Sequence, residues 1–221
     1  MTRRLRFFAL AVAAAAVLTA APAFAGPPLV CFPFDIGSAK TLPMGERGWE
    51  SVDPSYDPSH LVADTLALLT PQTPTIVRME TLRRATVYAA KNPKVAAALL
   101  DTLEARAGRA DANAGLAVFD LGYLAETYKQ AAWMPGAKGP SESMARARTI
   151  DGYMLVQKAQ TLTGDKSMAF ALVAMSVDKT RDPAGMAQLR AHVAAAREAA
   201  KTDASVRANL ANHWTETLAQ F

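Results

Sequence analysis

The pattern of apolar and polar positions changes abruptly near Tyr56. Beyond it, apolar side chains recur at steps of three and four residues in alanine-rich segments, which is the spacing of an amphipathic α-helix. The last segment shows this period through Val206, Leu210 and Trp214. No segment combines alternating polarity with β-branched residues, so strands are not predicted. The pattern therefore predicts an all-α fold.

Helix starts are marked repeatedly by a capping residue followed by proline, which suits the first helical position because its missing N–H has no partner there. Asp57-Pro58, Thr73-Pro74, Asn92-Pro93 and Asp182-Pro183 are of this kind. Further predicted caps are Asp111, Ser141, Asp165 and Asp203. About eight helices are expected, over residues 58–70, 74–90, 93–109, 112–131, 142–163, 166–178, 183–200 and 204–220.

Short connections favour antiparallel neighbours, so we expect stacked helical hairpins in a single helical domain over residues 57–221. The longer break WMPGAKGP at 133–140 is a candidate hinge between two halves. Residues 26–56 contain many prolines and glycines and no helical period, and they are predicted to form an extended arm packed on the helices.

Residues 1–25 have the three regions of a secretory signal peptide. Three arginines precede the apolar run FFALAVAAAAVL, and Ala23-Phe24-Ala25 matches a signal-peptidase site. We expect cleavage after Ala25 and a soluble periplasmic or secreted protein. No later apolar run reaches the roughly 20 residues of a membrane helix, so no membrane span is expected after cleavage.

Cleavage also removes most of the net charge. The whole chain has 24 basic and 20 acidic residues, and three of the arginines lie in residues 1–25, so the mature chain has a net charge of only +1. This balance gives no electrostatic reason to expect nucleic acid as a partner. With a single cysteine, the chain cannot form an internal disulfide or a C-x-x-C redox pair.

Two segments resemble tetratricopeptide-repeat proteins. LAVFDLGYLAETY at 116–128 is similar to a first repeat helix, with Leu121 and Gly122 where that family has leucine and glycine, and LVQKAQTLTGD at 155–165 resembles a repeat end. The family's regular 34-residue period is absent, so an irregular bundle remains an alternative. The resemblance implies a helical solenoid that binds proteins or peptides.

Cys31 is the only thiol, and it lies in an apolar part of the arm. Apolar surroundings raise a thiol pKa and reduce its reactivity, so a structural role as a small, buried, inward-facing residue is expected. The alternatives are catalysis or redox sensing, an intermolecular disulfide and contact with a ligand. His60 and Asp64 stand four residues apart, a spacing that suits two metal ligands or a hydrogen bond between the two side chains. The hydrogen bond is the favoured interpretation, and no metal is assigned.

Arg83 and Arg84 follow Glu80 at helical ion-pair spacings, which predicts a charged surface face or an anion-binding patch. Asp120 and Asp151 each precede a Gly-Tyr pair. If the two carboxylates converged in a groove they could act as acid and base. A structural bond to tyrosine or arginine is the favoured interpretation.

No G-x-S-x-G, phosphate-binding glycine loop, H-E-x-x-H or dinucleotide fingerprint occurs in the sequence, which lowers the expectation of an enzyme. We therefore expect no cofactor. The sequence favours an exported binding or scaffolding module for another exported protein or a peptide. The alternative is a groove enzyme, or a metal or small-ligand binder, that uses residues near the arm.

Overall fold

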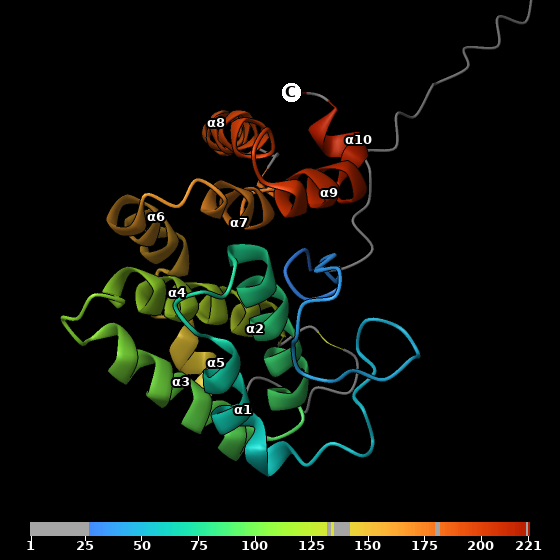
Figure 1. Ribbon diagram of the computed structural model, residues 1–221, viewed down its shortest axis with the longest axis vertical. Helices are drawn as coiled ribbons and strands as arrows, with labels where there is room; N and C mark the ends of the chain where they lie inside the picture. Colours follow the sequence, from blue (N-terminus) through green and yellow to red (C-terminus); the bar gives the residue numbers. More distant parts are fainter. Residues whose placement is uncertain (1–26, 132–133, 135–141, 180–181, 220) are drawn as a thin grey trace, which may run out of the picture.

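The computed structural model describes residues 27–131, 134, 142–179, 182–219 and 221 (Figure 1). The regular elements within these ranges are all helices that pack against one another, which confirms the all-α prediction. In chain order they are η1 (Pro58–His60), α1 (Leu61–Leu68), α2 (Thr75–Ala89), α3 (Pro93–Ala107), α4 (Ala114–Ala131), α5 (Glu142–Ala147), α6 (Gly152–Thr163), α7 (Met168–Ala174), α8 (Pro183–Ala199), α9 (Ala204–Asn212) and α10 (Thr215–Leu218). Within the described part of the chain, no helix has both the length and the apolarity required to cross a bilayer.

Two helices form the centre of the molecule. Helix α4 packs against α2, α3, α5 and α6, and helix α2 packs against α1, α3, α4 and α7. Every residue of α2 except Arg84 is buried, although this helix contains several charged and hydroxyl side chains. Helix α7, which is wholly buried, contacts α2 on one side and α8 on the other (Figure 1). It thereby joins the C-terminal helices to the rest of the core.

Local capping accounts for several of the helix starts. The side chains of Asn92, Asp182 and Asp203 accept hydrogen bonds from amides of the first turns of α3, α8 and α9, and Asp57 does the same for η1. The prediction that Thr73 caps α2 is wrong. Its hydroxyl donates instead to the Leu68 carbonyl, so it holds the turn between α1 and α2.

Two of the predicted helices are each broken in two. The segment 142–163 forms α5 and α6, and Asp151 starts α6 by accepting a hydrogen bond from the Met154 amide. The segment 204–220 breaks after α9, where Trp214 adopts a left-handed conformation with φ of 51°. The candidate hinge at 133–140 and the predicted Ser141 cap lie outside the described residues, apart from the buried Met134.

The first break brings two glycines into contact. Gly122, inside α4, faces Gly152 at the start of α6, and a Cβ atom on Gly122 would lie 2.8 Å from the Gly152 carbonyl oxygen. The Gly152 amide also donates to the Glu126 carboxylate at 2.9 Å. The two Gly-Tyr motifs in the sequence are therefore packing partners. Because neither Gly122 nor Gly152 has a side chain, α4 and α6 can approach closely.

We expect Gly122→Ala to destabilise the protein by about 1–3 kcal/mol, the usual range for overpacking a core, because the added methyl would push α6 away from α4. Gly108→Ala is the matched control. At Gly108 the backbone is right-handed, with φ of −77°, and the nearest atom to an added Cβ is 3.5 Å away. Urea unfolding should show little change, or a slight gain, for the control. Equal stability of the two variants would contradict the close approach of α4 and α6.

Candidate functional site

The N-terminal arm, residues 27–56, lies along the helices next to α2 (blue to cyan in Figure 1). It contains no α-helix, but Leu29, Val30, Phe34 and Leu42 are buried in the common core. Burying each such side chain contributes roughly 1.5–3 kcal/mol. The arm therefore covers the face of the helical domain formed by α2, α4 and α9, which we call the groove, and it completes the core.

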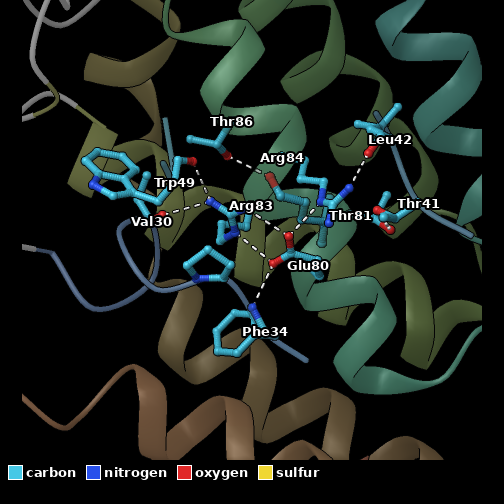
Figure 2. A network of polar contacts seen from close by, with 12 residues as sticks. Val30, Phe34, Thr41, Leu42, Trp49, Glu80, Thr81, Arg83, Arg84 and Thr86 are labelled. Atoms are coloured by element: carbon cyan, nitrogen blue, oxygen red, sulfur yellow. Dashed lines mark hydrogen bonds and ion pairs between the residues drawn. The ribbon is translucent and has the colours of Figure 1, made fainter. Parts of the chain in front are cut away.

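The polar centre of this groove is Glu80, whose side chain is fully buried (Figure 2). Its carboxylate accepts hydrogen bonds from Arg83 (Nε 2.7 Å, Nη2 2.8 Å) and from Arg84 (Nε 2.6 Å). The amide of Phe34, in the arm, donates to the same carboxylate at 3.0 Å. The prediction of a charged surface face on this helix is wrong, because Arg83 is also buried and Arg84 is only 22% exposed.

The two arginines use their remaining donors on the main chain of the arm. The Nη1 group of Arg83 donates to the carbonyl oxygens of Val30 and Trp49, both at 3.1 Å. The Nη1 group of Arg84 donates to the Leu42 carbonyl at 2.6 Å (Figure 2). Each arginine thus joins Glu80 to a main-chain carbonyl of the arm.

A second set of contacts comes from the C-terminal part of the chain. The side-chain amide of Asn209, on α9, accepts from the Asp35 amide at 2.9 Å and donates to the Asp35 carbonyl at 2.8 Å. His213, four residues later, places Nε2 3.0 Å from the Pro33 carbonyl oxygen. On α4, Gln130 accepts from the Leu29 amide at 2.7 Å. These side chains bond backbone groups of the arm.

The charged groups in this region are held in defined protonation states. Burial alone would raise the pKa of Glu80, but the hydrogen bonds from Arg83, Arg84 and the Phe34 amide outweigh it and lower the pKa. Glu80 is therefore ionised at neutral pH. For Cys31 burial dominates over the nearby Arg83 guanidinium and raises the thiol pKa to about 11. The thiol of Cys31 is half-buried, and it is protonated and weakly nucleophilic at neutral pH.

The remaining candidates do not join this site. His60 is exposed at the end of η1, and Asp64 accepts a hydrogen bond from Tyr56 at 2.8 Å. The prediction of a hydrogen bond between His60 and Asp64 is therefore wrong. Asp64 does line a shallow depression of about 280 Å³ between the arm and α1. Among the described residues, no three histidine, cysteine or acidic side chains group together as metal ligands.

Asp120 and Asp151 lie in different environments. Asp120 is fully buried, and both of its carboxylate oxygens accept from Nη1 of Arg78, a residue of α2, at 2.8 Å. Burial raises the pKa of Asp120 to about 6, although Arg78 acts in the opposite direction. Asp151 is exposed and caps α6. The two carboxylates therefore do not converge in one groove, and each has a structural partner instead.

A separate polar cluster joins α6 to α8. The Tyr153 hydroxyl lies 2.6 Å from Nε2 of His192, and the Lys179 ammonium stands 4.6 Å from the centre of the Tyr153 ring. Burial raises the pKa of Tyr153 and lowers the pKa of His192, the latter with help from Lys179. Both groups are therefore uncharged at neutral pH, and their contact is a neutral hydrogen bond between helices.

The arm groove was only partly visible in the sequence. Arg83 and Arg84 stand at ion-pair spacings from Glu80, but Asn209, Gln130 and His213 belong to no motif. One signal for Asn209 exists in the spacing, because Asn209 and His213 stand four residues apart and therefore share a helical face. Nothing in the sequence indicates that this face meets residues 33–35, which lie more than 170 positions away.

Comparison of the chain with protein-family models, with curated proteins and with solved structures finds no match. The geometry of the groove and the side chains that line it are therefore the basis for inferring a function.

We expect Glu80→Gln to destabilise the protein by about 3 kcal/mol or more, because Arg83 would remain buried without its carboxylate partner. Glu198→Gln is the control. Glu198 forms an i,i+3 pair with Lys201, as Glu80 does with Arg83, but both of its side chains are more than 60% exposed. Urea unfolding at pH 7 should show no measurable change for this control. A similar stability for Glu80→Gln and the unmodified protein would mean that Glu80 does not hold the arm.

Proposed function

We propose that this protein is an exported helical module that binds extended polypeptide segments. The binding surface is the groove between α2, α4 and α9 that its own arm occupies. What supports this proposal is the way the arm is held. Side chains of the helical domain bond its main-chain amides and carbonyls from Leu29 to Trp49.

Main-chain recognition of this kind provides affinity for an extended chain with little dependence on its sequence, and pockets for individual side chains then provide specificity. In this groove the buried side chains of the arm are all apolar, namely Leu29, Val30, Phe34 and Leu42. The preferred partner is therefore a segment with large apolar residues four positions apart, as Val30 and Phe34 are. It begins with a turn, as the arm does where the Val30 and Cys31 amides donate to the Pro27 carbonyl, and is extended beyond it. Another exported protein, or a peptide released from one, would supply such a segment.

The alternative of a small-ligand site near the arm has one observation in its favour. A hollow of about 590 Å³ lies within the loop of residues 44–54 and is lined by Glu46, Arg47 and Asp53 among others. It is open to solvent, and its lining includes none of the seven candidate residues from the sequence. Peptide binding has more support because the polar contacts converge on the arm.

The test uses a full-length mature chain whose own arm is weakened by Val30→Ala and Phe34→Ala. A synthetic peptide of residues 29–43 with the original side chains should bind this variant and raise its melting temperature. The same peptide methylated on the amide nitrogens of Phe34 and Asp35 keeps every side chain but cannot donate to Glu80 and Asn209. The bond to Glu80 is charge-assisted and contributes about 1.5–3 kcal/mol, so calorimetry should show binding at least tenfold weaker.

Asn209→Leu in the weakened variant is the matched change on the protein side, since leucine is similar in size but lacks the amide. It should weaken the unmodified peptide more than the methylated one, because the unmodified peptide loses two bonds to Asn209 and the methylated one only the bond at the Asp35 carbonyl. Binding of both peptides with equal affinity would show that apolar contacts alone hold the arm. No binding of either peptide would contradict the proposed function.

Export is part of the proposal, and it rests on the arginine-led apolar run and the Ala23-Phe24-Ala25 site. Mass spectrometry of the protein purified from its native host should show Gly26 as the N-terminal residue, in the extracytoplasmic fraction. An N-terminus at Cys31 carrying acyl chains would instead identify a lipoprotein. A chain that retains residues 1–25 in the cytoplasm would contradict export.

A further inference from the structure

Two shallow hollows adjoin between the arm and helix α1. The first has a volume of about 280 Å³ and is lined by arm residues 41–43 and by Asp64, Ala67 and Leu68 of α1. The second, of about 260 Å³, is lined by arm residues 39–40, again by Ala67 and Leu68, and by the turn between α1 and α2. Because the hollows share Ala67 and Leu68, they form one continuous depression, which we call the α1 cleft.

The arm forms one wall of the α1 cleft, and part of its main chain there is unpaired. Residues 39–45 of the arm have neither helix nor turn structure. This stretch is fixed to α2, because the Thr41 hydroxyl bonds a threonine hydroxyl of that helix and the Leu42 carbonyl accepts from Arg84 (Figure 2). Within the described part of the chain, the main-chain amides and carbonyls of Lys40 and Thr41 have no hydrogen-bond partner. Free main-chain groups of this kind can pair with a second extended segment.

The middle of the α1 cleft is apolar, and its two ends carry opposite charges. Ala67 and Leu68 form the shared middle, whereas Asp64 lines only the first hollow and Lys40 only the second. Among the described residues that line the hollows, these two are the only charged ones. The Tyr56 hydroxyl bonds Oδ2 of Asp64 and leaves the other oxygen, and the exposed Lys40 has no ion-pair partner within the described ranges. Both charged groups are therefore free to bind a ligand.

We propose that the α1 cleft binds a short extended peptide segment with a basic residue at the Asp64 end and an acidic residue at the Lys40 end. The unpaired main chain of the arm bonds the backbone of the segment, and Ala67 and Leu68 contact its apolar middle. The arm wall from Lys40 to Pro43 is three residue steps long, which is roughly 10 Å for an extended chain. A segment of about four residues matches this length.

This site goes beyond the proposed function because here the arm is a wall of the site, whereas in the groove it is the occupant. A segment in the α1 cleft contacts the arm and α1 together, so its binding energy stabilises the arm in its place. A ligand of the α1 cleft therefore opposes the exchange of the arm for a partner segment. Only this last consequence rests on the proposed function.

The test uses the mature chain with its arm intact and the capped peptide acetyl-Arg-Val-Val-Glu-amide as the probe. In ¹⁵N-resolved NMR, the probe should cause saturable chemical-shift changes at the amides of residues 39–42 and 64–68. Lys40→Glu should weaken the probe at least about threefold, because a charge attraction at one end becomes a repulsion. The same variant should bind acetyl-Arg-Val-Val-Arg-amide more tightly than the probe, which reverses the preference of the unmodified protein.

Lys158→Glu is the matched control, since Lys158 is exposed on α6 and the substitution changes the net charge by the same amount. It should leave both affinities and their order unchanged. Absence of saturable changes, changes confined to residues 29–35, or an equal effect of the two variants would overturn the α1 cleft as a binding site. Peptide binding in the groove is measured on the weakened arm, so either site can fail while the other stands.

Discussion

Burial of Glu80 at the centre of α2 is the constraint on which the rest of the structure depends. A carboxylate without contact with water needs hydrogen-bond donors around both oxygens. Helix α2 supplies them through Arg83 and Arg84, and the arm supplies one more through the Phe34 amide. The arginines then have unused donors, which the carbonyls of the arm accept. The helical domain and the arm are therefore parts of one folded unit.

The arm is held by side chains of α2 and of α9, and these two sets of hydrogen bonds differ in their chemistry. Beside α2 the arm is held by charge-assisted bonds to buried ions, which are costly to expose to solvent or to leave unpaired. Beside α9 it is held by the neutral amide of Asn209 and by the imidazole ring of His213. Phe34 lies between Pro33 and Asp35, so the Glu80 cluster and the α9 side chains hold the same stretch of the arm.

Fold class and helix starts follow from local physics, which is why they were predictable. Asn92, Asp182 and Asp203 cap their helices through contacts within three residues, and the apolar period places α2 and α4 correctly to within about two residues. The breaks at residues 148–151 and at Trp214 were not predictable in this way. Each depends on a neighbour distant in sequence, namely Gly122 on α4 for the first and the arm for the second.

The same division holds for the candidate site. Glu80, Arg83 and Arg84 stand at ion-pair spacings that the sequence shows plainly, so their mutual pairing was readable from a single helix. The burial of these three side chains could not be read from the sequence, because an i,i+3 or i,i+4 pair has the same spacing on a surface and in a core. The sequence by itself determined that the chain is helical and where most helices begin, since those signals act over one turn. Only the tertiary structure decided which polar side chains turn inward and meet the arm, because that outcome depends on which apolar surfaces must be covered.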